Sequence, residues 1–181
     1  EKNKESNQIT TTTKKKFIWH KLDDTSRPRR RKVLHLYSGP ANRVKGLAYY
    51  LNLQEIDVVE VDVINMNSDK QDLLNDETWN EYKSRIQNGE FDFVFGGPPC
   101  KTFSDARHNQ PGPPVLRDKN HVYGFPTTQA EERELKPCHL KEIADDNSLA
   151  ERMAEACSIM QEKGKGFAVE QPLSWRKGWN T

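Results

Sequence analysis

One cysteine stands just after an apolar run of the chain. Residues 91–95 are three phenylalanines, one valine and one aspartate, and Gly96-Gly97-Pro98-Pro99 connects this run to Cys100. Such a run predicts a buried parallel strand, and the glycines break it and let the backbone approach a ligand closely. The prolines fix the backbone ahead of the thiol, at the strand end where open α/β sheets bind ligands. We therefore predict that Cys100 is a nucleophile, the alternative being an inert buried thiol.

Two carboxylates close a second predicted strand, residues 56–63. Glu60 and Asp62 lie near its end, and the strand follows a glycine-bearing turn in the chain. An acidic side chain in that place can accept hydrogen bonds from ribose hydroxyls. Both residues are therefore candidates for binding a nucleoside, although either could simply cap the strand end.

Two further carboxylates are expected at the same edge of the sheet. Asp72 begins a brief third strand or turn, residues 72–74, and would face the same cleft. Glu170 closes another predicted strand, residues 166–170, which we expect to neighbour the strand before Cys100. A thiol and a carboxylate would then lie at the carboxyl ends of two parallel strands.

The first predicted strand, residues 33–37, leads into the tight turn Ser38-Gly39-Pro40. A strand, a glycine turn and a helix amino end form a cradle for nucleotide-like ligands, because backbone N–H groups and the helix dipole point there. His35 lies inside the strand, and we expect it to be a core residue. The helix after the turn is predicted from an apolar face made of Val44, Leu47, Ala48 and Leu51.

Two more helices complete an alternating pattern. Residues 78–87 are predicted to be helical up to the stop signal Asn88-Gly89, and another helix is expected to open at Asn147 or Ser148 and to end at Gly164. Strands that alternate with helices predict an α/β fold. We expect a Rossmann-like, doubly wound, mostly parallel sheet with helices on both faces.

The domain organisation follows from changes in composition. Residues 1–16 carry no periodicity and are predicted to be a disordered polar tail, and residues 17–32 form an apolar and then basic lead-in segment. Residues 33–181 are expected to form the catalytic domain. Within it, residues 101–146 resist a regular interpretation and are predicted to be a long lid loop. Cys138-His139 has no second pair at metal-ligand spacing, so we predict no metal site.

Composition limits the possible partners. Lys and Arg number 28 against 27 Asp and Glu, a net charge of +1, so nucleic-acid binding cannot be argued from overall charge. No apolar run approaches the roughly 18 residues that cross a membrane, which predicts no membrane association. Three widely spaced cysteines without a paired framework indicate a reducing compartment, nucleus or cytoplasm rather than secretion.

The residues around Cys100 also resemble a known catalytic motif. The run from Gly96 to Cys100 together with Phe103, Ser104 and Ala106 is similar, nearly residue for residue, to the catalytic motif of cytosine-5 DNA methyltransferases. Further matches follow in that family's order over about residues 33–173, which implies a class I S-adenosylmethionine-dependent methyltransferase fold in partial form. These further matches are Leu36-Tyr37-Ser38-Gly39, Glu60-Val61-Asp62, Asp72 and Glu170-Gln171-Pro172.

The resemblance implies a cofactor, S-adenosyl-L-methionine, and gives each segment a part in binding it. The turn after the first strand would pass under the cofactor, the two strand-end acids would meet its ribose, and the acid of residues 72–74 would lie near its adenine. The residues that the resemblance assigns to the cofactor are Tyr37, Ser38, Gly39, Glu60, Asp62, Asp72, Gly97 and Pro98.

The resemblance also implies a reaction on a cytosine base in DNA. Cys100 would add to C6 of the base while Glu170 hydrogen-bonds N3 and stabilises the developing charge. Because C6 is unreachable in a duplex, the base must be flipped out. Arg107 is a third catalytic candidate, and Ser104 and Arg117 are candidates for contacts with the substrate.

Two other functions stay open at this point. After the Glu170 motif we find no Arg-x-Arg motif, target-recognition domain or closing cofactor motif, so we expect further domains or chains to supply recognition. A non-catalytic methyltransferase-fold module within a larger viral or mobile-element polypeptide is one alternative. An RNA cytosine methyltransferase is the other.

Overall fold

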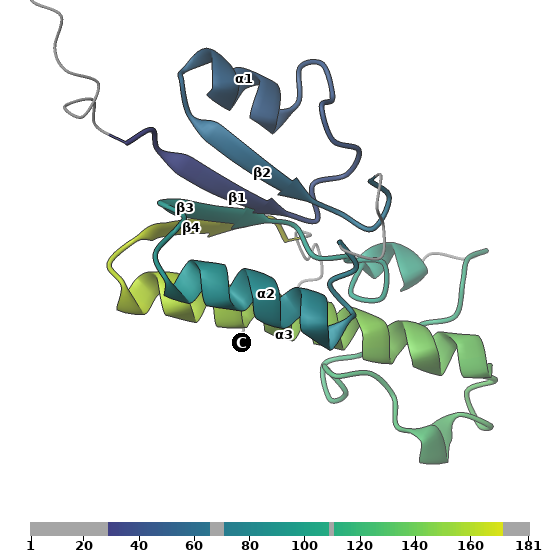
Figure 1. Cartoon of the computed structure of the whole chain (residues 1–181). Coiled ribbons are helices and arrows are strands. Elements are labelled where there is room, and N and C mark those ends of the chain that lie inside the picture. Colours follow the sequence, from purple (N-terminus) through teal and green to yellow (C-terminus); the bar gives the residue numbers. More distant parts are fainter. Residues whose placement is uncertain (1–28, 66–70, 109–110, 172–181) are drawn as a thin grey trace, which may run out of the picture.

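Across the residues that the structure describes, four parallel strands form a single sheet (Figure 1). The computed structural model describes residues 29–65, 71–108 and 111–171. The strand order is β2-β1-β3-β4, and every neighbouring pair is parallel. This arrangement confirms the predicted α/β, Rossmann-like sheet. The strands are β1 (Lys32–Leu36), β2 (Asp57–Val61), β3 (Phe93–Gly96) and β4 (Gly166–Val169).

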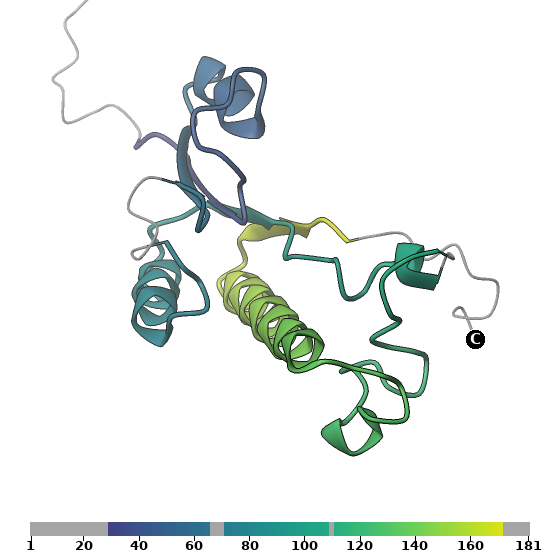
Figure 2. The same ribbon diagram turned by 90° about the vertical axis from the view of Figure 1, so that its right-hand side faces the viewer.

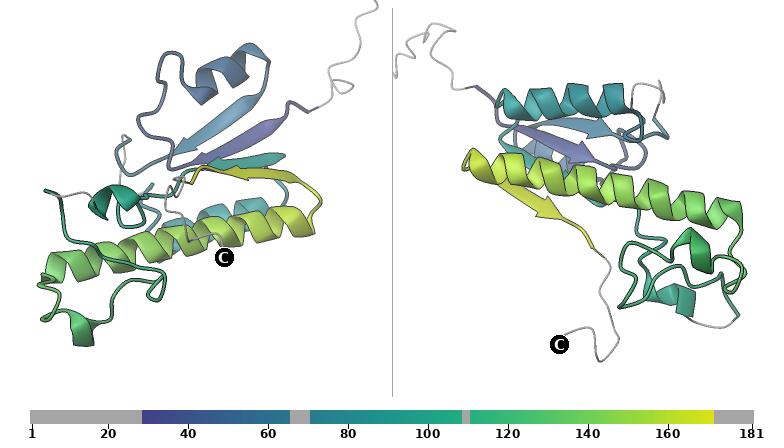
Figure 3. Two further views of the ribbon diagram at one scale, coloured as in Figure 1. Left: turned by 180° about the vertical axis from the view of Figure 1, so that it is seen from behind. Right: turned by 90° about the horizontal axis from the view of Figure 1, so that it is seen from below.

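Helices lie on both faces of the sheet, as the alternating pattern predicts. Helix α1 (Leu47–Leu53) covers part of one face, and α2 (Asp76–Gln87) and α3 (Pro137–Glu162) lie side by side on the other (Figures 2 and 3). Two short 3₁₀ helices, η3 (Asp105–His108) and η4 (Thr127–Gln129), occur between β3 and α3.

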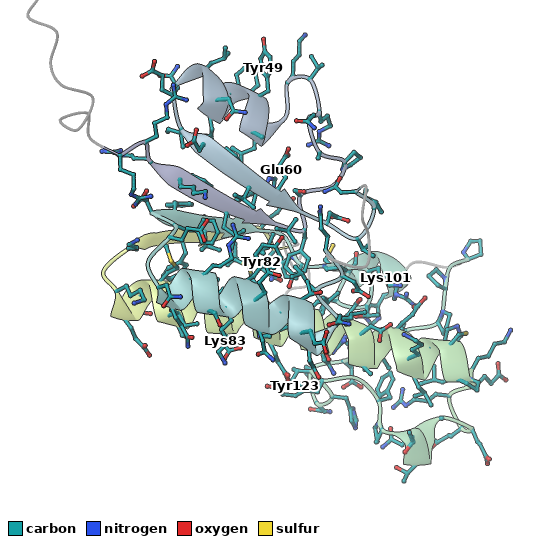
Figure 4. The ribbon with its side chains drawn as sticks, viewed as in Figure 1. Tyr49, Glu60, Tyr82, Lys83, Lys101 and Tyr123 are labelled. Atoms are coloured by element: carbon teal, nitrogen blue, oxygen red, sulfur yellow. The ribbon has the colours of Figure 1, made fainter. Side chains whose placement is uncertain are left out.

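The main core lies between the sheet and the pair α2 and α3. Alternate strand residues point to this face, and Leu34, Leu36 and Val94 are fully buried there. Helix α2 turns Tyr82 toward the sheet and Lys83 away from it (Figure 4). The other buried members of this core are Val61, Leu73, Trp79, Ile86, Phe91, Met153, Ala156, Cys157, Ile159 and Met160.

The opposite face is only partly covered, because α1 is two turns long. Beside it runs an apolar groove of about 630 Å³, which extends from α1 across β1 and β3 to β4. Leu47, Leu51, Val33, Phe93 and Phe95 form most of its walls.

Helix α1 begins later than the apolar spacing predicts. Val44 was expected on its buried face but is 76% exposed and lies before the helix. Asn42 and Lys45 have φ angles of 57° and 62°. Such left-handed residues cannot belong to a right-handed helix, so the chain turns here until Gly46.

Helix α3 begins ten residues earlier than predicted, at Pro137 instead of Asn147 or Ser148. Proline suits the first turn of a helix, and His139 Nδ1 accepts the Lys136 N–H at 3.1 Å and so caps the helix amino end. The predicted lid loop 101–146 is therefore wrong in its last ten residues. Asn147 and Ser148, the predicted caps, lie inside the helix.

Residues 101–136 carry a small core of their own against the amino half of α3. Leu116 is fully buried, and Phe125, Ala130 and Leu135 pack with it against Ile143. An extended segment that buries its own apolar residues can hold a defined shape without regular secondary structure.

The basic lead-in segment is described only from Arg29, and the predicted tail 1–16 and residues 17–28 lie outside the described residues. Arg29 donates to Asp92 at 2.6 Å, and Arg30 lies 3.6 Å from Asp57. These ion pairs fasten the start of β1 to the amino ends of β3 and β2.

Cys100, Cys138 and Cys157 are all free thiols, with the first two exposed and the third buried. In the part of the chain that the structure describes, no helix is long and apolar enough to cross a membrane. The same residues contain no group of three His, Cys, Asp or Glu side chains that could hold a metal ion.

Glu90 joins α2 to β1, and its replacement tests how much this contact stabilises the sheet. Its carboxylate accepts from Arg85 Nε and Nη2 at 2.7 and 2.9 Å and from Lys32 Nζ at 2.6 Å. The Arg85 hydrogen bonds, followed by those of Lys32, lower the pKa of the Glu90 carboxyl from 4.5 to about 2. Glu90→Gln should lower the free energy of unfolding at pH 7 by about 1 kcal/mol.

The contribution of Glu90 to the free energy of unfolding depends on pH. Because the pKa of Glu90 is lower in the folded state, its contribution is complete above about pH 4.5 and is lost as the pH falls toward 2. In urea unfolding, the difference in the free energy of unfolding between wild type and Glu90→Gln should be smaller at pH 3 than at pH 7. The control variant, Glu132→Gln, removes an exposed carboxylate that has no ion pair among the described residues. If it lowers the free energy of unfolding as much as Glu90→Gln does, the role given to the Glu90 ion pair is contradicted.

Candidate functional site

The carboxyl ends of the strands border a cavity of about 200 Å³. Three residues predicted to bind the cofactor, Tyr37, Asp62 and Asp72, line it together. Pro99 lines it from the segment that leads to Cys100, so the predicted binding residues and the predicted nucleophile segment meet at one cavity. The remaining walls are Val63, Gln71, Leu73, Leu74 and Leu149.

Tyr37 reaches this cavity through a strained backbone. Its φ angle is 57°, which is unfavourable for a bulky residue and is tolerated where the surroundings hold it. Its hydroxyl donates to the carbonyl oxygen of Leu149 on α3 at 2.8 Å. Burial raises the pKa of the Tyr37 phenol, so the ring stays neutral and forms one wall of the cavity.

Asp62 links the end of β2 to the turn after β1. Its Oδ2 accepts the Gly39 N–H at 2.9 Å, and its Oδ1 accepts the Ile64 N–H at 3.1 Å. Gly39 has a φ angle of 72°, which favours glycine, so the turn and the carboxylate fit each other. Ser38 beside it is buried, and its N–H donates to Val61 O at 3.2 Å.

Glu60, in β2, does not line the cavity. Its Oε2 accepts the Asn42 N–H at 3.0 Å, so it supports the outer part of the same turn. His35, its neighbour in the strand register, is buried as predicted, and its ring packs 4.9 Å from that of Phe95. Burial lowers the pKa of His35.

Asp72 lies in a turn rather than in a third strand. Its Oδ1 accepts the Leu74 N–H at 2.9 Å, and its backbone carbonyl accepts the Asn75 N–H at 3.0 Å. The turn therefore leads directly into the Asn75 cap of α2, whose side chain accepts from Glu77 N and Thr78 N.

Glu170 lies against the loop that leads to Cys100. β4 pairs with β3 as predicted, and the Glu170 N–H donates to Gly96 O at 2.9 Å. A Cβ added to Gly97 would lie 3.3 Å from Glu170 Cβ and 3.4 Å from its Oε2. Glycine at position 97 therefore makes room for the carboxylate, and Pro98 behind it is buried.

Cys100 is exposed and opens a turn, residues 100–103, closed by the Phe103 N–H donating to Cys100 O at 3.0 Å. We call residues 100–103 the Cys100 turn. An exposed thiol at the head of a fixed turn is accessible to a substrate. Ser104 follows directly, and its carbonyl accepts the Arg107 N–H at 3.2 Å.

Both predicted arginines point inward. Arg107 is 9% exposed and donates to Lys101 O at 2.6 Å, to Pro114 O at 3.1 Å and to Glu142 at 3.0 Å. Arg117 is 5% exposed, and its guanidinium lies 3.8 Å over the Phe103 ring. Burial lowers the pKa of Arg117, which the Asp146 carboxylate opposes. The structure uses both guanidinium groups to hold residues 101–117 together.

Sequence reasoning missed several residues of this region. Leu149 lines the cavity, Thr102 lies within the Cys100 turn, and Asp146 accepts from Thr102, but none of these three was predicted as a site residue. Pro99, which also lines the cavity, was predicted only to fix the backbone ahead of the thiol. For Thr102 the signal was its place two residues after Cys100. Asp146 carried no signal because its contact spans 44 residues.

The larger apolar groove beside α1 is a weaker candidate for chemistry than the smaller cavity. Its walls are almost entirely apolar, with Arg31 and Asp92 as the charged residues, and no predicted site residue lines it. Binding sites combine apolar walls with a few convergent polar groups, a description that fits the 200 Å³ cavity.

Comparisons of the chain with family models, with curated proteins and with solved structures find no match in any of the three.

Asp62→Ala tests the link between the two strand ends. The change leaves the Gly39 and Ile64 N–H groups without their acceptor, so we expect the free energy of unfolding to fall by about 1–2 kcal/mol. Asp57→Ala removes an exposed carboxylate from the same strand and should cost less than about 0.5 kcal/mol. Equal losses in urea unfolding would contradict the role of Asp62.

Proposed function

We propose that this chain is an S-adenosylmethionine-dependent cytosine-C5 methyltransferase-like domain that acts on DNA through Cys100. One observation carries the proposal. Side chains from after β1, after β2 and from residues 71–74 line a single cavity, and that cavity is also lined by Pro99, the residue before the proposed nucleophile. A donor bound there would lie next to the thiol segment.

The cavity suits the adenosine end of the cofactor. Its volume of about 200 Å³ is below that of a whole drug-sized ligand site, so it fits a part of the molecule such as a base. Leu73, Leu74 and Leu149 supply apolar walls, and Asp62 and Asp72 supply hydrogen-bond acceptors. When bound, the cofactor supplies an electrophilic methyl group.

The residues of the chain support the rest of the reaction. The Cys100 thiolate forms a bond to C6 of the cytosine, which makes C5 nucleophilic. Glu170, which lies against Gly97, would donate a hydrogen bond from its protonated carboxyl group to N3 of the ring and so stabilise the charge that develops there. After methyl transfer a base takes the C5 proton, the C6–sulfur bond breaks and the thiolate is released.

The exposure of Cys100 supports an unpaired base as substrate. A thiol at the head of a surface turn cannot reach C6 inside a stacked duplex, so the base must leave the helix.

Covalent trapping tests the nucleophile. A DNA oligonucleotide with 5-fluorocytosine should form an adduct that survives denaturing gel electrophoresis, only with S-adenosylmethionine present, because fluorine cannot leave C5 as a proton does. Cys100→Ser should abolish the adduct. Cys138→Ser, which removes the other exposed thiol, should leave it unchanged.

The same trapping experiment separates the substrates and the classes of function. An adduct formed only with a 5-fluorocytosine RNA would replace DNA by RNA as the substrate. Absence of an adduct with both nucleic acids, in protein that binds the cofactor, would favour a non-catalytic module.

Calorimetry with S-adenosylmethionine tests the cavity. Leu149→Trp should fill it and lower the affinity at least tenfold, whereas Cys100→Ser should bind as the wild type does. Leu53→Trp enlarges an exposed residue on α1 and serves as the matched control. Unchanged binding by Leu149→Trp would place the cofactor elsewhere.

A further inference from the structure

A buried hydroxyl fastens the Cys100 turn to helix α3. Thr102 is 3% exposed, and its Oγ1 donates to Asp146 Oδ2 at 2.6 Å. The Thr102 N–H donates to the same oxygen at 3.2 Å. Asp146 is itself 2% exposed, so one buried carboxylate holds both the side chain and the backbone of a residue two positions from the nucleophile.

Arg117 completes the contact from the other side. Its Nη2 and Nε donate to Thr102 Oγ1 at 3.0 and 3.2 Å, so the hydroxyl accepts from the guanidinium while it donates to the carboxylate. Nη1 donates to Asn147 Oδ1 at 2.7 Å and to Val122 O at 2.8 Å. Thr102, Asp146 and Arg117 are called the Thr102 cluster below.

The hydroxyl of Thr102 serves both partners at once, as a donor to the carboxylate and an acceptor from the guanidinium. A buried carboxylate and a buried guanidinium each cost free energy unless they are hydrogen-bonded, and Thr102 Oγ1 satisfies one of each. Charge-assisted hydrogen bonds of this kind are stronger and more directional than neutral ones. The cluster therefore fixes the orientation of the turn as well as its position.

The orientation of the Cys100 turn determines where the Cys100 thiol lies. Its own side chain is exposed, so packing does not fix the thiol. The backbone on one side is held at Gly96 by the Glu170 N–H, and on the other side by Thr102. Arg107 also donates a hydrogen bond to the carbonyl oxygen of Lys101, the residue between Cys100 and Thr102.

We propose that the Thr102 cluster is the positioning device of the Cys100 thiol: Thr102, Asp146 and Arg117 hold the turn that aims the sulfur, without touching the substrate. The inference rests on the proposed function for the role of Cys100. The ordering of the turn itself does not depend on that role.

Thr102→Val tests the proposal, with Thr102→Ser as the matched control. Valine keeps the shape and loses all three hydrogen bonds of the hydroxyl, whereas serine keeps a hydroxyl that can make all three. In hydrogen exchange of the full chain, amides of residues 100–108 should lose about tenfold in protection in Thr102→Val and keep it in Thr102→Ser. Amides of β1 and α2 should be unchanged in both variants.

Trapping on 5-fluorocytosine DNA adds a kinetic measurement. At saturating DNA, Thr102→Val should form the adduct about ten- to a hundredfold more slowly, because a small displacement of a reacting atom costs that much. The DNA concentration for half-saturation should stay unchanged, and Thr102→Ser should restore the rate.

The outcomes separate this inference from the proposed function. Wild-type exchange of residues 100–108 in a folded Thr102→Val would overturn the positioning role, whatever the activity. No adduct in wild type would overturn the function alone, since the exchange result still decides the role of the cluster. If Thr102→Val does not fold, Asp146→Asn, which keeps the shape and weakens the acceptor, must show the same local loss of protection, and its absence overturns the proposal.

Discussion

The parallel register of the four strands is the constraint on which the rest of the structure depends. Leu36 is opposite Val61 and Gly96, and Gly96 is opposite Val169, so all four strands end at one level. The residues that follow these ends are therefore neighbours, although they are distant in the chain. A shift of one residue in any pair would turn its side chains to the other face of the sheet.

Helix α3 couples this edge to the core. At 26 residues it is about 39 Å long, and its two halves contact different parts of the structure. The carboxyl half buries Met153 and Met160 against the sheet, and the amino half carries Asp146 beneath the Cys100 turn. Leu149, between them, lines the cavity and accepts from Tyr37. One rigid element thus sets the core, the cavity and the turn together.

The fold could be predicted from the sequence wherever local pattern decides the structure. Short apolar runs placed all four strands, and the stop at Asn88-Gly89 placed the end of α2. The start of α3 was predicted wrongly, because Asn147, which looked like a cap, instead lies inside the helix, where it accepts from Arg117 and donates to Tyr123 O. A contact with a distant segment overrode the local signal there.

The candidate site could be predicted in part for the same reason. Asp62 reaches the cavity because it follows the end of β2, and Asp72 reaches it from the turn that leads into α2. Arg107 and Arg117 were expected to meet a substrate, since arginine beside a nucleophile favours phosphate contacts. Their inward direction depends on backbone carbonyls, such as those of Pro114 and Ile143, that only the folded chain brings near them.

The position of β4 at the outside of the sheet has a consequence for how this molecule meets others. Its sequence Gly-Phe-Ala-Val contains no charge or proline, and Phe167 and Val169 remain 39% and 38% exposed. Natural proteins usually protect edge strands with lysine, proline or a bulge, because the unpaired amide and carbonyl groups of an edge strand can pair with a strand of another molecule. The side chains of β4 include no lysine or proline, so they do not hinder this edge of the sheet from pairing with a further strand.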